Sequence, residues 1–220
     1  MKYEFGTERP EQLKEYWPGQ YELFSHYEYL SGVPHALFLI TTRKENGMAN
    51  ACYHTWSAFS GDGGGFFVVL TGLMQHTHTY KNILREKEFC VNFLSPAYDA
   101  QCKKTIVDNG DEVDEIVSSG LTTEAARIVA MPRVKEAFLT FECLLESVSD
   151  LSGKGVSAMI VGRVVNAAVD ENHKDIASWC KNFTYYIHAP KDPATGEGED
   201  EAWAVLAPYG VPKPKDERYD

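Results

Sequence analysis

Residues 50–92 read NACYHTWSAFSGDGGGFFVVLTGLMQHTHTYKNILREKEFCVN, and this stretch decides how the chain folds. The apolar runs Phe66 to Leu70 and Phe89 to Phe93 predict two buried strands. Between them apolar residues recur at helical spacing, so a short helix with one buried stripe is predicted over residues 79–86. The polar residues 76–82 therefore lie where a strand leads into a helix.

A β-hairpin is predicted just before this stretch. The apolar runs Ala36 to Thr42 and Met48 to Thr55 flank Asn46-Gly47, and Asn-Gly tolerates the positive φ angles of a tight hairpin turn. Two strands joined in this way favour an antiparallel or mixed sheet. The glycine cluster Gly61 to Gly65 is predicted to be a flexible turn, because no Lys-Ser or Lys-Thr follows it as a phosphate-binding P-loop requires.

The second half of the chain changes from helical to strand-like spacing. Residues 96–131 have a helical pattern in which a first helix should break at Asn109-Gly110 and a second should end at Gly120. From Ala137 to Leu145 apolar and polar residues alternate with a period of two, which predicts a half-exposed antiparallel strand. The run Val156 to Val169 predicts a long strand with a bulge or bend at Gly162.

The two ends of the chain are expected to be additions to one main body. Residues 1–32 predict short helical turns that pack aromatic side chains onto that body, without chemistry of their own. Residues 33–190 would form the main domain, with a short helix over 176–181, and residues 191–220 a mobile loop and a tail that frays from residue 212. At least six strand-like runs with helices between them predict a mainly β fold, a β-barrel with inserted helices.

Composition excludes several classes of function. A net charge of -11 without a compensating Lys/Arg stripe argues against nucleic-acid binding. No apolar run approaches the roughly 20 residues of a membrane helix, and the N-terminus lacks the apolar core of a signal peptide, so we expect a cytoplasmic protein that does not enter a membrane. Five cysteines with no C-x-x-C pair fit reduced thiols rather than a disulfide framework or a zinc knuckle.

Residues 76–82, HTHTYKN, could bind an anion at the start of the predicted helix. Free backbone N–H groups carry partial positive charge there, threonine hydroxyls add donors, and Lys81 supplies a cation. The alternative is simple capping of the helix by Thr77 or Thr79. The residues alone leave both interpretations open.

Metal binding and nucleophilic catalysis are weaker interpretations of the same region. His76 and His78 on an extended segment would point to one face, and His54 could be a third metal ligand. No carboxylate accompanies them, so we predict no metal site. Cys52 and Cys90 lie inside strand patterns, where inert core thiols are the usual case. The sequence identifies no catalytic residue.

An ordered set of short motifs resembles a known family. The motifs include N-G-M-A-N-A (Asn46 to Ala51), Trp56-Ser57, T-Y-K-N-I (Thr79 to Ile83), F-C-V-N-F (Phe89 to Phe93) and Gly162-x-Val164. In this order they resemble the flavin reductase-like family of FMN-binding split barrels, and the flavoredoxin branch most of all. The resemblance covers about residues 33–170 and implies a split barrel of Greek-key type.

The resemblance also implies a function and a site. It implies an FMN-binding flavoprotein that passes electrons from NAD(P)H or a redox protein, bound transiently as the donor, to an acceptor. It further implies a homodimer with the flavin near the subunit interface. The flavin ring would be lined by Asn50, Ala51, Thr55, Trp56 and Ser57. The phosphate would be held by Thr77, Thr79 and Asn82, with His78 and Lys81 beside it.

Two departures from the family pattern bear on this site. Residues 73–75 are Leu, Met and Gln where relatives often have a basic residue. The phosphate would therefore be bound more weakly, and Lys81 or Arg43 would have to replace the missing cation. The cluster Gly61 to Gly65 replaces a shorter Pro-Pro loop close to the flavin. These departures support an alternative, a non-catalytic relative that binds another small anionic ligand in the same pocket.

Overall fold

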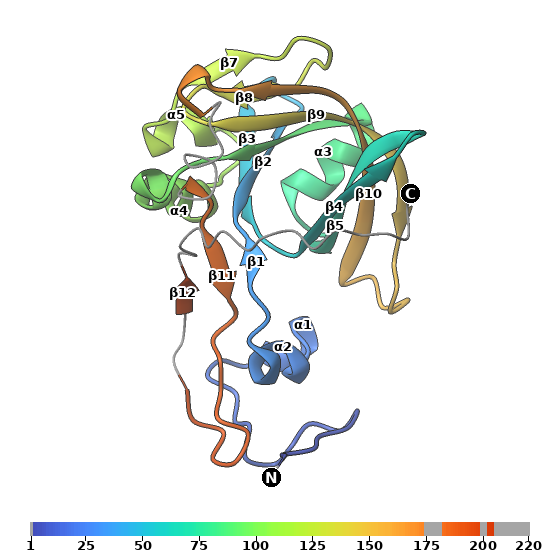
Figure 1. Ribbon diagram of the computed structural model, residues 1–220, viewed down its shortest axis with the longest axis vertical. Coiled ribbons are helices and arrows are strands. Elements are labelled where there is room, and N and C mark those ends of the chain that lie inside the picture. The colour runs from blue at the N-terminus through green and yellow to red at the C-terminus, as the bar shows by residue number, and fades with distance from the viewer. Residues whose placement is uncertain (1, 174–181, 199–201, 205–220) are drawn as a thin grey trace, which may run out of the picture.

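The computed structural model describes residues 2–173, 182–198 and 202–204 (Figure 1). Seven strands form the main sheet: β2 (Phe38–Arg43), β3 (Ala49–His54), β4 (Ser57–Asp62), β5 (Gly65–Met74), β6 (Glu88–Phe93), β9 (Leu139–Ser149) and β10 (Ser157–Val169). Their order is β3-β2-β6-β9-β10-β5-β4, with antiparallel neighbours throughout. The mainly β prediction is confirmed. The helix expected over 176–181 and the tail from residue 212 lie outside the described residues.

Shorter elements surround this sheet. The helices are α1 (Gln20–Leu23), α2 (His26–Ser31), α3 (His78–Glu86), α4 (Asp99–Val107) and α5 (Glu115–Ser119), with 3-10 turns η1 (Pro96–Tyr98) and η2 (Glu171–His173). One small sheet contains β1 (His35–Ala36), β11 (Tyr185–Ile187) and β12 (Ala202–Ala204), and another contains β7 (Thr123–Ala125) and β8 (Pro132–Val134). In Figure 1, α1 and α2 lie beyond one end of the main sheet, on the side of β1 and β11.

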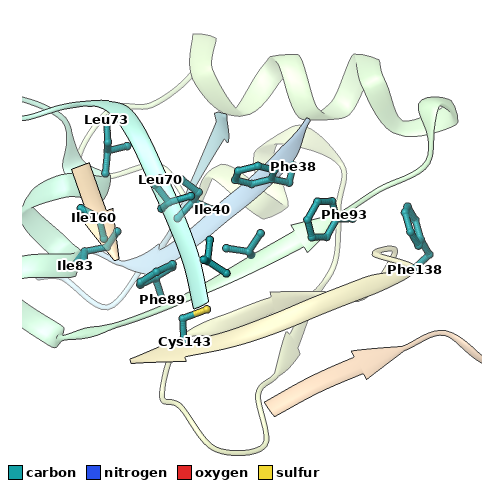
Figure 2. Close-up of a cluster of buried hydrophobic side chains, with 12 residues drawn as sticks. Phe38, Ile40, Leu70, Leu73, Ile83, Phe89, Phe93, Phe138, Cys143 and Ile160 are labelled. Atoms are coloured by element: carbon teal, nitrogen blue, oxygen red, sulfur yellow. The ribbon is translucent and has the colours of Figure 1, made fainter. Parts of the chain in front are cut away.

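The main hydrophobic core lies between the strands of the sheet and α3. Figure 2 shows its side chains, which include Phe38, Ile40, Leu70, Leu73, Ile83, Phe89, Phe93, Cys143 and Ile160. Burying one such large apolar side chain contributes about 1.5–3 kcal/mol. Helix α3 turns Thr79, Asn82 and Ile83 inward. The buried Ile83 therefore fixes where the N-terminus of α3 lies over the sheet.

The predicted hairpin and the predicted bulge are both confirmed. Strands β2 and β3 pair from Arg43 with Ala49 onward, and Gly47 in the turn has φ 87°. In β10 the pairing with β9 shifts between Val161 and Gly162. A Cβ atom on Gly162 would lie 2.3 Å from Cζ of Phe89, so only glycine lets the Phe89 ring pack against this strand.

The two helices predicted within residues 96–131 are confirmed, and the second ends at Gly120 as predicted, but residues 121–131 at the end of the helical pattern are not helical. Helices α4 and α5 occupy residues 99–107 and 115–119, but β7 follows and pairs with β8. The N–H groups of Arg127, Ile128 and Val129 donate to the carboxylate of Glu142 at 2.9, 2.7 and 3.3 Å. Glu142 is fully buried on β9. Its oxygens replace the carbonyl acceptors that a helix would supply.

Strand β4 was not predicted, although the glycine cluster after it is the expected turn. Gly63 and Gly64 connect β4 to β5, and Asp62 pairs with Gly65. The strand is mostly exposed and contains few large apolar residues. Pairing with β5, rather than an apolar pattern of its own, determines its conformation.

The free edge of β3 is covered by acidic side chains. The N–H of Ala51 donates to Oε2 of Glu115 at 2.6 Å, and that of Ala49 reaches Oδ2 of Asp114 at 3.5 Å. Asp114 is also the N-cap of α5, because its Oδ1 accepts from the N–H of Val117. Carboxylates at the start of α5 thus satisfy donors that an edge strand leaves unpaired.

The N-terminal helical turns pack on the body through aromatic rings, as predicted. The ring of Phe24 stacks on Trp56 with centroids 5.7 Å apart and meets the ring of His188 at 4.9 Å. Nδ1 of His188 also lies 3.3 Å from Oε2 of Glu28 on α2.

Candidate functional site

A pocket of about 340 Å³ opens at the N-terminus of α3, and we call it the α3 pocket. Its lining residues come from β3, from the turn into α3, and from α4 and α5: Asn50, Ala51, Cys52, His76, Thr77, His78, Thr79, Thr105, Ile106, Asn109 and Glu115. Its size falls in the range of small-molecule sites. Two groups of predicted residues, Asn50 and Ala51 on one side and Thr77 to Thr79 on the other, are brought together here.

Thr77 caps α3, so this part of the capping interpretation is confirmed. Its hydroxyl accepts from the N–H of Tyr80 at 3.4 Å and donates to the carbonyl of Met74 at 2.8 Å. The N–H groups of His78 and Thr79, at the first two positions of the helix, have no acceptor among the described residues. Two donors at the positive end of the helix therefore remain open to a ligand.

Asn50 and Thr79 connect the two sides of the pocket. Nδ2 of Asn50 donates to Oγ1 of Thr79 at 2.8 Å, and both residues are buried. This contact holds β3 against the first turn of α3. Replacing either side chain would change the distance between the two groups of predicted residues.

Glu115, which lines the pocket, belongs to a buried ion pair that the sequence did not reveal. Oε1 of Glu115 lies 2.9 Å from Nζ of Lys44, with side chains 2% and 5% exposed. Nζ of Lys44 also donates to the carbonyls of Gly110 and Val113. Burial raises the pKa of Glu115 above its ordinary value, although the hydrogen bond from Lys44 opposes this. Glu115 holds the Ala51 N–H, so that backbone donor is already engaged.

The two histidines lie at the mouth of the pocket. Nε2 of His78 is 2.8 Å from Oδ1 of Asp111, and its Nδ1 is 4.0 Å from Oε1 of Glu115. His76 comes just before the capping residue Thr77 and lines the same pocket. Among residues 2–173, 182–198 and 202–204, no three His, Cys, Asp or Glu side chains are grouped as metal ligands would be.

Lys81 and Asn82 face a different pocket. This neighbouring pocket, of about 450 Å³, shares only His78 with the α3 pocket and is lined by Lys44, Glu45, Asn46, His78, Lys81, Asn82, Arg85, Asp111 and Glu112. Nδ2 of Asn82 donates to Oγ1 of Thr42 at 3.0 Å, and its Oδ1 accepts from Arg85. Asn82 therefore anchors α3 to β2.

Thr55, Trp56 and Ser57 lie outside the residues that line the α3 pocket. Trp56 packs instead against the rings of Phe24 and His188, at 5.7 and 5.5 Å. The hydroxyl of Ser57 donates to the carbonyl of Thr55 at 2.9 Å. The structure thus divides the predicted ring-binding set, with Asn50 and Ala51 in the pocket, residues 55–57 outside its lining, and Trp56 against the N-terminal turns.

The described cysteines lie mostly in the core, as expected. Cys52, Cys90, Cys102 and Cys143 are all free. Burial raises the pKa of Cys52 to about 11. A thiol with this pKa is protonated at neutral pH, which argues against a nucleophilic role for Cys52.

Buried His54 is expected to make the fold sensitive to mild acid. Burial lowers its pKa from 6.5 to about 4, and its ring packs on Phe38 and Trp56. The unfolded chain takes up this proton below pH 6.5 whereas the folded chain does not, so the free energy of unfolding should fall by roughly 2 kcal/mol between pH 7 and pH 5. Urea titrations of wild type and His54→Gln measure this difference. The same pH dependence in both proteins would contradict it.

Comparison with known proteins identifies the family. Residues 30–187 match the model of the flavin reductase like domain. An uncharacterised protein of Aquifex aeolicus (strain VF5) is 36% identical over 97 residues, covering 43% of this chain and 49% of that protein, so the match spans about half the length of the relative.

Solved structures confirm the fold. Nitrilotriacetate monooxygenase component B from Bacillus cereus superposes with a TM-score of 0.73 at 18% identity, over 96% of this chain and 98% of that one. Flavoredoxin of Desulfovibrio vulgaris (Miyazaki F) gives 0.66 at 19% identity, over 84% and 93%. A protein with a split barrel domain is also among the similar structures. In the described residues no helix is long and apolar enough to cross a membrane. The chain belongs to the flavin reductase-like domain family, with the split-barrel fold that its motifs predict.

Proposed function

We propose that this protein binds FMN in the α3 pocket and passes electrons from NAD(P)H or a redox protein to an acceptor. One observation carries the proposal. Asn50 and Ala51 of β3 meet Thr77 to Thr79 of α3 in one pocket, although the two groups are far apart in the sequence. These are residues that the family motifs assign to the flavin ring and to its phosphate.

The donors in the pocket fit such a ligand. The open N–H groups of His78 and Thr79 suit the phosphate, and the helix dipole favours its charge. Ala51 and Ile106 offer apolar surface for a ring. The bound flavin would supply the redox chemistry. Glu115 would form a rigid part of the pocket lining beside the flavin, because Lys44 and the Ala51 N–H hold its carboxylate in place.

A homodimer is part of the proposal. Ile106 at the rim of the pocket is 48% exposed, and the adjacent Val107 is 81% exposed. A second copy that covered these side chains would also close the mouth of the pocket. Size-exclusion chromatography with light scattering should give twice the monomer mass of 24.7 kDa. A cytoplasmic location is proposed on the free thiols of the described cysteines.

FMN titration tests the proposal directly. The purified protein is expected to quench flavin fluorescence at micromolar FMN, and anaerobic NADH or NADPH should bleach the bound flavin. Thr79→Val removes the acceptor of the Asn50 amide and a pocket hydroxyl, and should weaken FMN binding about tenfold. Thr123→Val on exposed β7 is the matched control and should bind as wild type does. A colourless protein that leaves flavin fluorescence unchanged would refute the proposal.

A non-catalytic relative that binds another small anion is the second candidate. The observation that favours it is the absence of lysine and arginine among the described residues that line the α3 pocket. FMN binding without NAD(P)H oxidation in the presence of common electron acceptors would support this candidate over the first.

A further inference from the structure

The chain contains two Asn-Gly pairs, Asn46-Gly47 and Asn109-Gly110, and both are exposed. An asparagine followed by glycine is prone to lose its side-chain amide spontaneously, because glycine has no Cβ to obstruct attack by its own backbone nitrogen. The reaction requires that nitrogen to reach Cγ of the asparagine. Hydrogen bonds that hold either group in another position therefore slow the reaction.

The first pair is held by three hydrogen bonds. The N–H of Gly47 donates to the carbonyl of Lys44 at 3.0 Å, within the turn between β2 and β3. Nδ2 of Asn46 donates to the carbonyl of Asp111 at 2.9 Å, and its Oδ1 accepts from the N–H of Met48 at 3.1 Å. Both reacting groups of this pair are thus engaged by other partners.

The second pair is far less constrained. It lies in residues 108–114, which form neither helix nor strand between α4 and α5. The N–H of Gly110 has no acceptor among the described residues, although its carbonyl accepts from Nζ of Lys44. In the same part of the chain, the side chain of Asn109 makes a single long hydrogen bond, 3.4 Å from Nδ2 to the carbonyl of Ile106. The attacking nitrogen is therefore available at this pair.

We propose that the fold leaves Asn109 open to spontaneous deamidation while it protects Asn46, and that the carboxylate formed at position 109 weakens binding of an anionic ligand in the α3 pocket. The backbone nitrogen of Gly110 forms a bond to Cγ of Asn109. Its proton passes through solvent to the side-chain nitrogen, which leaves as ammonia. Water then opens the cyclic imide at either carbonyl carbon, so that aspartate or isoaspartate remains, and nothing is oxidised or reduced.

The new carboxylate would belong to the lining of the α3 pocket. Asn109 lines this pocket, and none of its described lining residues is a lysine or an arginine. A negative charge added there repels an anion by Coulomb interaction, without a guanidinium or ammonium group of the lining to offset it. This consequence rests on FMN binding in the α3 pocket, whereas the deamidation itself does not.

Peptide mass spectrometry of the folded protein, incubated at pH 8.5, tests the modification. The peptide with Asn109 should gain the mass of an amide replaced by a carboxyl group. The peptide with Asn46 should react at least about tenfold more slowly, because three hydrogen bonds must first break there. Equal rates, or a faster reaction at Asn46, would overturn the inference.

Protein unfolded in guanidinium chloride is the control for local sequence. Without the fold, the two Asn-Gly pairs should react at similar rates. A difference that persists after unfolding would also overturn the inference, because the neighbouring residues rather than the hydrogen bonds would then be its cause.

Gly110→Ala is the matched variant for the mechanism. A Cβ atom at Gly110 would lie 3.7 Å from Cγ2 of Val113, which is an ordinary contact, so the fold should accept the methyl group. The same methyl group obstructs the attack on Cγ of Asn109, and deamidation there should become several-fold slower. An unchanged rate would contradict attack by the Gly110 nitrogen.

Asn109→Asp and Asn109→Gln test the effect on the ligand, because both remove the asparagine and one adds a charge. Flavin fluorescence should show an FMN affinity several-fold lower in Asn109→Asp than in Asn109→Gln, whereas riboflavin, which lacks the phosphate, should bind equally to both. Equal FMN affinities would overturn the effect on the ligand. Wild-type protein that binds neither flavin would overturn FMN binding together with this effect, while mass spectrometry still decides the deamidation.

Discussion

Glu142→Ala is expected to lower the free energy of unfolding by about 3–5 kcal/mol, because it removes a buried carboxylate that serves several donors. The carboxylate accepts from the N–H groups of Arg127, Ile128 and Val129 and from Nδ2 of Asn166. Without it, these donors lose their partner inside the fold. Urea denaturation followed by circular dichroism at pH 7 measures the loss.

Glu146→Ala on the same strand is the control. Glu146 forms an exposed ion pair with Arg163 at 2.9 Å, and exposed pairs contribute little to stability. The Glu142 variant should therefore lose far more stability than the Glu146 variant. Similar losses would show that Glu142 does not hold residues 127–129.

The carboxylate of Glu142 is also expected to make the stability of the fold depend on pH in the acid range. Burial raises the pKa of Glu142, but the hydrogen bonds from Arg127, Ile128, Val129 and Asn166 together bring it below its usual 4.5. A carboxyl whose pKa is lower in the folded state contributes stability above pH 4.5 and loses it as the pH falls through the folded value. Glu142→Gln should remove this part of the acid sensitivity, which urea titrations at pH 5 and 3.5 would detect.

Gly162→Ala is expected to cost about 3 kcal/mol of folding free energy, at the upper end for overpacked cores. The added Cβ would lie 2.3 Å from Cζ and 2.8 Å from Cε1 of Phe89, and 3.2 Å from Cβ of Cys143. The Phe89 ring is buried among other core residues and has little room to move. Equilibrium denaturation of the variant measures the cost.

A second substitution identifies the cause. Phe89→Leu shortens the clashing side chain, so the double variant Gly162→Ala/Phe89→Leu should be more stable than the sum of the two single losses predicts. Gly63→Ala is the control, because a Cβ there meets nothing within 4 Å, and its effect should stay within roughly 0.5 kcal/mol. Strict additivity of the two core changes would contradict the steric explanation.

The sequence pattern predicted those parts of the fold whose conformation depends on residues that are neighbours in the chain. The Asn46-Gly47 turn and the long apolar run of β10 carry their own signals, because turn geometry and burial depend on neighbouring residues. Residues 121–131 do not carry such a signal. Within them, the conformation of residues 127–129 depends on Glu142, whose carboxylate reaches them from another strand. Strand β4 likewise depends on its partner β5.

The same difference between local features and contacts between distant elements applies to the candidate site. Thr77 to Thr79 could be placed at a helix start, since capping is a local feature. The ion pair of Lys44 and Glu115 could not be found, because the residues lie on separate elements and an acidic residue at the start of α5 has the ordinary explanation of helix-end charge. The local sequence pattern does not show that α5 packs against β3.

Under the proposed function, the position of α5 would link ligand binding to protection from misassembly. Glu115 both lines the α3 pocket and occupies the Ala51 N–H on the open side of β3. A fluctuation that lifts α5 away from β3 would remove a wall of the pocket and at the same moment expose backbone donors to a strand from another molecule. A ligand bound in the α3 pocket, as proposed, would favour the packed position of α5 and so make this opening rarer in proportion to its occupancy.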